Sequence, residues 1–253
     1  SFHSPPAVGG WTPLHRVSCV HGLGMYPHLI ESCPPDFKYP QRQFSAKPAW
    51  MSRSRTMATA RYLIESCGAN VRAVNKDGET PFHLACYCGK LYLVKYLFAN
   101  SIVDAPRADG LTPLHMAIQV GELHIVRYLM DHTPVVDSNL FGFACRTAHV
   151  HILKYLVARG LCNLKLDKET GRTPLHEAVE YCSLEAAQYL IEVCGADVFA
   201  INAEGHTPLQ AARDWCGRPF PPLMEYLERI EYLRKQPTTN TTWVDIFESL
   251  LPY

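Results

Sequence analysis

The residue types and spacing that could do chemistry are concentrated in the stretch His83-x-x-Cys86-x-Cys88. Imidazole and thiolate groups are ligands that zinc prefers, and a tetrahedral site would need a fourth ligand from elsewhere in the chain. The sequence offers no evident source for that ligand, and His83 and Cys86 recur as His115 and Cys145 at the same offsets from a repeated motif. Because recurrence favours packing over a single metal site, we predict no metal here.

Other candidate groups have equally simple structural explanations. His149 and His151 bring two imidazoles near a predicted turn, and we interpret them as an exposed pair. Cys33, Cys67 and Cys194 share one offset from the repeated motif, which predicts that they pack as small, mostly buried apolar side chains. Phosphate-binding loops, paired carboxylates and Ser-His-Asp orders are absent in recognisable form. We therefore predict a non-catalytic protein without a cofactor.

The element that must position these residues is a repeated helix start. A threonine, a proline, an apolar residue and a histidine or glutamine follow one another at Thr12–His15, Thr80–His83, Thr112–His115, Thr173–His176 and Thr207–Gln210. The threonine hydroxyl can cap free backbone donors, and proline is favoured at the first helical position. Positions 173 and 207 are one period of 34 residues apart, and 12 and 80 are two periods apart. This spacing predicts two degenerate units, near Ala46 and Asn139.

Two apolar columns support this register. The position five residues after each start is occupied by Val17, Met51, Ala85, Ala117, Ala144, Ala178 and Ala212. The position seventeen residues after it is occupied by Leu29, Leu63, Leu97, Leu129, Leu156, Leu190 and Met224. With these motifs the chain resembles the ankyrin repeat family over about residues 10–235. The resemblance implies an all-α solenoid of stacked helix-turn-helix units with projecting finger turns.

The predicted organisation has three parts. Residues 1–9 form an N-terminal extension, residues 10–235 the repeat domain, and residues 236–253 a polar linker with a short amphipathic helix. The units of the repeat domain are anchored near 12, 46, 80, 112, 139, 173 and 207. The stripe of Leu223, Tyr226, Leu227, Ile230 and Leu233 predicts a helix that caps the stack. The last helix, over 243–251, is too short to be stable alone and must dock on the solenoid, another domain or a partner.

Irregular positions carry information about function because the scaffold does not require them. Only 27 residues separate Thr112 from Asn139, and the shortfall lies in 132–138, where a finger should project. This clipped finger is either a tolerated deletion or a notch that admits a partner segment. Some ankyrin proteins carry a C-terminal box that recruits a ubiquitin ligase, so the resemblance also implies a ubiquitin-ligase component as an alternative partner.

Members of the family commonly contact partners through the fingers and the exposed ends of the first helices, and the resemblance predicts binding residues at the same positions here. At the helix ends these are Arg53, Tyr87, Gln119, Arg146, Glu180, Tyr181, Asp214 and Trp215. In the fingers they are Lys76, Asp77, Arg107, Asp109, Lys168 and Glu169. Tyrosine, tryptophan and arginine dominate binding hot spots, so we predict a protein or peptide partner on the concave face. The alternatives are aromatic residues that only cover helix ends and finger residues selected by turn chemistry.

Composition limits the classes of partner. The 253 residues include 24 basic and 24 acidic side chains, and this balance argues against nucleic acid or an anionic membrane surface as the main partner. No apolar run is long enough to cross a bilayer. Ten cysteines are too few for a disulfide scaffold, which favours an intracellular, cytoplasmic or nuclear setting. A second hypothesis is the recognition arm of a larger protein, such as a ligase adaptor, channel or enzyme, with its output domain beyond residue 253.

Overall fold

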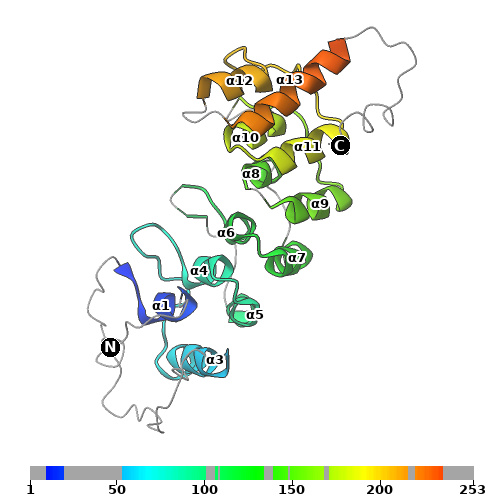
Figure 1. Cartoon of the computed structure of the whole chain (residues 1–253). Coiled ribbons are helices and arrows are strands. Elements are labelled where there is room, and N and C mark those ends of the chain that lie inside the picture. Colours follow the sequence, from blue (N-terminus) through cyan, green and yellow to red (C-terminus); the bar gives the residue numbers. More distant parts are fainter. Residues whose placement is uncertain are drawn as a thin grey trace, which may run out of the picture. The chain divides into compact units, whose positions relative to one another are not determined.

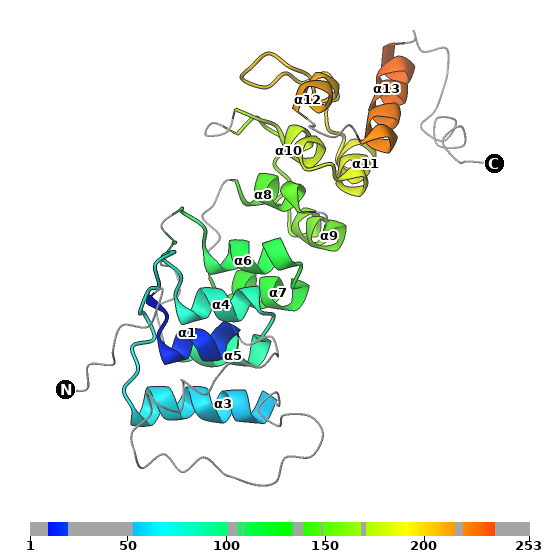
Figure 2. The same ribbon diagram turned by 60° about the vertical axis from the view of Figure 1, so that its left-hand side comes forward.

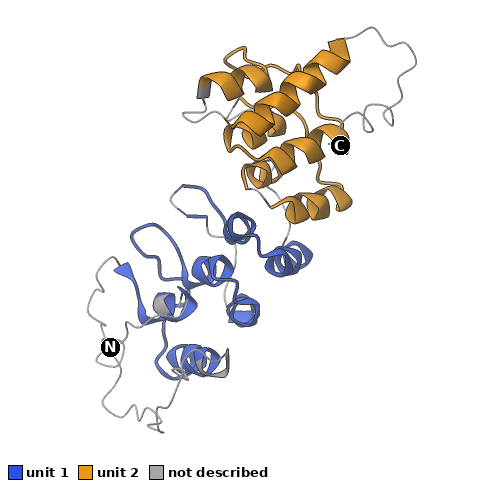
Figure 3. Ribbon diagram, in the orientation of Figure 1, with its two compact units in different colours: residues 1–135 blue, residues 136–253 orange. Residues whose placement is uncertain are grey.

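The computed structural model describes residues 10–19, 53–100, 106–107, 109–133, 139–147, 149–167, 171–215 and 220–235. Every regular element in these ranges is a helix, which confirms the all-α prediction. The chain divides into two compact units, residues 1–135 and residues 136–253 (Figure 3). Each unit is built from pairs of helices, with one member in an inner row beside the fingers and the other in an outer row.

Unit 1 contains three helix pairs within the described ranges (Figures 1 and 2). Its inner row consists of α1 (Pro13–Cys19), α4 (Pro81–Tyr87) and α6 (Pro113–Val120). Its outer row consists of α3 (Arg53–Arg61) with the π-helical turn η3 (Tyr62–Ser66), α5 (Leu91–Asn100) and α7 (Leu123–His132). The inner helices pack on one another in the order α1, α4, α6.

Unit 2 repeats the arrangement with three more pairs. Its inner row consists of α8 (Leu140–Arg146), α10 (Pro174–Glu180) and α12 (Pro208–Trp215). Its outer row consists of α9 (Val150–Ala158), α11 (Leu184–Glu192) and α13 (Pro221–Lys235). The predicted stripe of α13 packs inward, with Leu223, Tyr226, Leu227 and Ile230 buried and Glu225 exposed. The clipped finger at 134–138 and the segment 236–253 lie outside the described residues.

The period predicts a unit near Ala46 between those that begin at Thr12 and Thr80, but the described helices are stacked without one; residues 46–52 lie outside the described ranges. Helix α1 packs directly on α4, and His15 Nε2 donates to the Glu79 carbonyl at 2.8 Å, which leaves no layer between them. On the outer side, Tyr96 of α5 donates its hydroxyl hydrogen to Glu65 of η3 at 2.9 Å. Helices α1 and α3–η3 therefore form one pair, although residues 20–52 separate them in sequence. The described helices make six pairs, whereas the sequence predicts seven units.

The helix starts form as the motif predicts. Thr80 lies in extended backbone before α4, its hydroxyl accepts from the His83 backbone N–H, and Pro81 takes the first helical position. Thr173 caps α10 in the same way. The alanine column is fully buried where neighbouring inner helices meet, at Ala85, Ala117, Ala144 and Ala178. Small side chains at this position allow the inner helices to approach closely.

Gly160 ends α9 in left-handed backbone, with a φ of +74°. A β-carbon there would meet no neighbouring atom, so only the backbone conformation opposes a substitution. We expect Gly160→Ala to lower the free energy of unfolding by about 1 kcal/mol, because L-residues with a side chain are strained in this region. Gly160→Asn should lose less, since asparagine tolerates it. Urea unfolding measures both variants, and equal losses would contradict the conformational reason.

Candidate protein-binding surface

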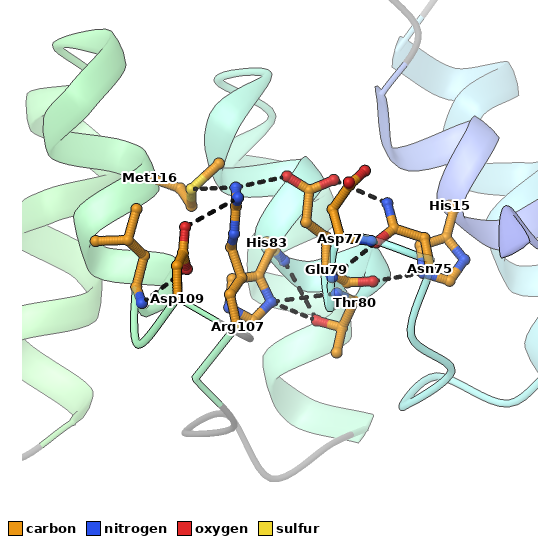
Figure 4. Close-up of polar contacts among 10 residues, drawn as sticks. His15, Asn75, Asp77, Glu79, Thr80, His83, Arg107, Asp109 and Met116 are labelled. Atoms are coloured by element: carbon orange, nitrogen blue, oxygen red, sulfur yellow. Dashed lines mark hydrogen bonds and ion pairs between the residues drawn. The ribbon is translucent and has the colours of Figure 1, made fainter. Parts of the chain in front are cut away.

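Two motif histidines, His15 and His176, link neighbouring helix pairs, and Figure 4 shows the first of them. The Nδ1 of His15 accepts from the Thr12 backbone N–H at 3.1 Å, so its Nε2 carries the proton donated to the Glu79 carbonyl. His176 likewise bonds the Thr173 hydroxyl at 2.7 Å and donates to the His206 carbonyl at 2.9 Å. These imidazoles tie an inner helix to the next finger and are not arranged as ligands.

The predicted cysteine pattern is correct at some positions and wrong at others. Cys86 and Cys145 are fully buried, as small core residues should be. Cys67 is exposed and Cys194 only half-buried, because the C-terminal end of an outer helix emerges at the surface; Cys33 lies outside the described residues. Across the part of the chain that the structure describes, no three histidine, cysteine or acidic side chains are placed to hold a metal ion.

The finger residues of unit 1 are held mainly by one another (Figure 4). Arg107 Nη1 donates to Glu79 at 2.8 Å, and Arg107 Nη2 lies 3.1 Å from Asp109. Asn75 donates its side-chain N–H to the other oxygen of Glu79 at 2.8 Å. The charge of Arg107 is therefore largely neutralised within the chain, and its predicted role as a partner contact stays a prediction. Lys76, at the tip of its finger, is exposed.

In unit 2, two of the predicted binding residues also form ion pairs inside the chain. Arg146 donates to both carboxylate oxygens of Glu177, from Nε at 2.8 Å and from Nη2 at 3.1 Å. Glu180 pairs with Arg172 at 2.6 Å, and burial raises the Glu180 pKa. Glu177 was not predicted as part of the site, although its signal in the sequence is a charged residue four positions after Thr173, where most other units have an apolar residue. Arg146 and Glu180 thus stabilise unit 2 through these ion pairs, and their contact with a partner stays a prediction.

The remaining predicted residues fall into two groups. Tyr87, Gln119, Tyr181, Asp77, Asp109 and Asp214 are exposed, as binding residues should be. Arg53 lies in α3 and Trp215 in α12, but their side chains are not among those that the structure describes. Lys168 and Glu169 lie outside the described residues altogether. Tyr87, Gln119 and the fingers at 76–77 and 107–109 belong to unit 1, whereas Tyr181 and Asp214 belong to unit 2. Their role in partner binding stays a prediction.

The fingers expose apolar side chains that sequence reasoning missed. Val74, Leu166 and Ile201 each directly precede the first residue of a finger turn, and all three are exposed. Their signal in the sequence is an aliphatic residue six or seven positions before the motif threonine, in a stretch where polar turn residues are expected. In unit 2, Leu166 and Ile201 occupy neighbouring fingers, which are joined by the Ala203 N–H donating to the Gly171 carbonyl at 2.7 Å.

Exposed acidic groups accompany these apolar residues in unit 2. Glu204 in the last finger and Asp214 in α12 are both exposed, and His206 lies between them, with Nδ1 3.7 Å from Glu204 and 3.9 Å from Asp214. The nearby arginines at 146 and 172 are already paired with carboxylates. Unit 2 therefore exposes Leu166, Ile201 and Tyr181 together with the carboxylates of Glu204 and Asp214.

Comparisons with known proteins agree with this architecture. The chain is 28% identical over 131 residues to the NF-kappa-B inhibitor cactus of Drosophila yakuba, covering 50% of this chain and 26% of that protein. It is 27% identical over 191 residues to cactus of Drosophila melanogaster, covering 73% and 38%. The chain thus spans well under half the length of these relatives.

A solved structure shares the fold. The crystal structure of the ankyrin repeat domain of Bcl-3, described as a unique member of the IkappaB protein family, has a TM-score of 0.56 and 24% identity and covers 87% of this chain and 86% of that one. No helix in the described ranges is long and apolar enough to cross a membrane. The family model for ankyrin repeats in three copies matches residues 49–140 and 137–202. Because these stretches make up more than half of the sequence, the chain belongs to the ankyrin repeat family.

Proposed function

We propose that this chain binds an NF-kappa-B-type protein through the finger side of unit 2. As an ankyrin repeat protein the chain is a protein–protein interaction module. The observation that carries the choice of surface is the exposure of aliphatic residues on neighbouring fingers, with Leu166 46% and Ile201 62% exposed. Turn chemistry does not require such residues, and their exposure costs free energy unless a partner covers them.

The chemistry of this surface defines the segment that it would accept. Tyr181, which follows α10 in the same unit, is a further large exposed side chain that suits an apolar anchor on the partner. Glu204 and Asp214 favour lysine or arginine next to that anchor. The predicted concave-face site is thereby narrowed to unit 2, with Arg146 and Glu180 acting as its support.

The choice of partner rests on the relatives. Two proteins that share 27% and 28% identity with this chain are named NF-kappa-B inhibitors. Their matched regions include ankyrin repeats of this chain, and a shared repeat surface is the simplest reason for a shared kind of partner. A non-catalytic, intracellular protein fits this proposal. The recognition-arm and ubiquitin-ligase hypotheses stay predictions, which the reading frame beyond residue 253 would test.

Calorimetric titration with a purified Drosophila NF-kappa-B protein tests the proposal. Leu166→Ser combined with Ile201→Ser should weaken binding at least tenfold, because truncating anchors in an interface costs more than about 1 kcal/mol each. The matched control combines Val193→Ser with Tyr232→Ser. These two apolar side chains are exposed at least as much as Leu166 and Ile201, and they lie on the outer side of the same unit. It should change the affinity less than twofold.

The outcomes separate the partner from the surface. Absence of binding by the wild-type chain would exclude an NF-kappa-B-type partner. Equal affinities for the finger variant and the outer-side control would exclude the finger surface while leaving the partner in place. If both variants have the melting temperature of the wild type, any difference in affinity reflects binding and not folding.

A further inference from the structure

Two cysteines meet at the ends of neighbouring inner helices of unit 1. Cys19 is the last residue of α1, and Cys88 directly follows α4. The Cys88 thiol donates to the Cys19 carbonyl oxygen at 3.1 Å, which places the Cys88 sulfur against the end of α1 that carries the Cys19 thiol. Both are free thiols, Cys88 buried and Cys19 half-buried, so reagents in solution reach the Cys19 sulfur more easily.

A buried lysine completes the cluster. Lys90 Nζ donates to the Val17 carbonyl at 3.0 Å, which holds the ammonium group at the end of α1 beside the cysteines. Burial lowers the Lys90 pKa, and the neighbouring sulfurs oppose that shift. The only acidic group that acts on the pair is Glu79, among the groups the structure describes around it. An amine and two thiols in one partly closed site are more than the packing of two helices requires.

The pKa values of the two cysteines are shifted in opposite directions. The interaction with the Cys88 thiol and, after the opposing effect of burial, the charge of Lys90 lower the Cys19 pKa to about 7. The same interaction and burial raise the pKa of Cys88 well above its ordinary value. Near neutral pH, Cys19 is therefore substantially a thiolate, whereas Cys88 keeps its proton. A thiolate is the form of cysteine that reacts.

We propose that Cys19 and Cys88 form a site of modification by hydroperoxides, in which Cys19 is oxidised first and Cys88 then closes a disulfide between α1 and α4. This inference is independent of the proposed partner. It assigns the reaction to residues that the protein-binding surface of unit 2 does not use. Its direct structural effect is a covalent link between the first two helix pairs of unit 1.

The chemistry balances with hydrogen peroxide as the oxidant. The Cys19 thiolate attacks one peroxide oxygen, the O–O bond breaks, and the departing hydroxide takes up a proton to leave as water. The sulfenic acid that forms on Cys19 is attacked by the Cys88 sulfur, the S–O bond breaks, and the Cys88 proton leaves with the hydroxide as a second water. Two thiols and one peroxide give one disulfide and two waters, so sulfur is oxidised and peroxide reduced.

Peptide mass spectrometry of the full chain after hydrogen peroxide treatment tests the site. A Cys19–Cys88 disulfide should form and be reversed by dithiothreitol. In Cys88→Ser, dimedone should instead trap a sulfenic acid on Cys19, and in Cys19→Ser neither product should form. Cys86, which is fully buried, serves as the internal control and should stay unmodified, since its reaction would reveal unfolding.

The pH profile of alkylation gives a second measurement. The rate of Cys19 alkylation by iodoacetamide should have its midpoint near pH 7, compared with about 8.5 for an ordinary cysteine. Lys90→Gln should move the midpoint upward if the ammonium group contributes. A midpoint near 8.5 in the wild-type chain, or oxidation at exposed Cys67 without a Cys19–Cys88 disulfide, would overturn the proposal.

Discussion

Replacing Arg146 with alanine should lower the free energy of unfolding by about 3 kcal/mol, because the substitution strands a buried carboxylate. The side chain of Glu177 is only 3% exposed, and Arg146 supplies two hydrogen bonds to it. Breaking a buried ion pair by removing one partner costs roughly 3–5 kcal/mol. The lower end applies here, since the Arg146 side chain is 25% exposed.

Urea unfolding followed by circular dichroism measures this loss, with a matched variant from the same unit as the control. Arg213 and Glu228 also form an ion pair, at 2.6 Å, but about half of each side chain is exposed. Arg213→Ala should therefore cost less than about 1 kcal/mol. Combining Arg146→Met with Glu177→Leu should restore most of the stability. Equal losses for the two arginine variants would show that Glu177 is not effectively buried.

Lowering the pH from 7 to 5 should destabilise unit 1 by about 2 kcal/mol through His83 alone. Burial, and then the charge of Arg107, hold the His83 pKa at about 4. Its Nε2 is buried without a hydrogen bond in the described part of the chain, and the opposing effects of the Leu111 backbone and Asp109 do not offset burial, so protonation there is unfavourable. Burial also lowers the pKa of His15, which adds to the effect in unit 1, and that of His176, which acts in the same direction in unit 2.

The sign follows from where protons bind. A histidine in an unfolded chain has a pKa of about 6.5, so between pH 6.5 and 4 the unfolded state binds more protons than the folded state. The stability is therefore fully present above about pH 6.5, falls as the pH drops through this window, and levels off below about 4. At pH 5, about 1.5 units below the pKa of an unfolded histidine, the free energy of unfolding is lowered by about 2 kcal/mol.

The chain itself suggests the variant that isolates His83. Gln210 occupies the motif-histidine position before α12, where its Oε1 accepts from the Thr207 N–H at 2.8 Å. His83→Gln should keep that local hydrogen bond to Thr80 and remove the titrating group. Hydrogen exchange of the α4 amides at pH 7 and pH 5 should then show a smaller loss of protection than in the wild type. His124→Gln, at an exposed position of α7, controls for removing an imidazole. An unchanged loss in His83→Gln would assign the acid sensitivity elsewhere.

The local part of the fold could be predicted because its signals lie within a few residues of one another. Thr80, Pro81 and His83 form a helix start from neighbouring groups, and the buried alanines and leucines recur at fixed offsets. The helical class, the motif-histidine contacts with threonine and the capping stripe of α13 are all of this kind. A repeat makes such signals stronger, since each unit tests the register independently.

The pairing of helices could not be predicted in the same way. A stretch of about one period between α1 and α3 leaves the register of every later residue unchanged, so periodicity predicts a layer between α1 and α4, which in fact pack directly on each other. The direct bond from His15 to Glu79, which is 64 residues away, shows the true neighbour. Periodicity measures distance along the chain, whereas stacking depends on which apolar faces meet in space.

The sequence by itself determined the ankyrin units, their helix starts and the small residues that allow inner helices to stack, because these features depend on short-range geometry and repeat. Only the tertiary structure decided which charged residues are available to a partner. Arg107 and Arg146 meet carboxylates on neighbouring helix pairs, whereas Leu166 and Ile201 stay exposed on the fingers. A side chain's charge and hydrophobicity can be seen in its residue type, but its availability depends on what the folded chain places beside it.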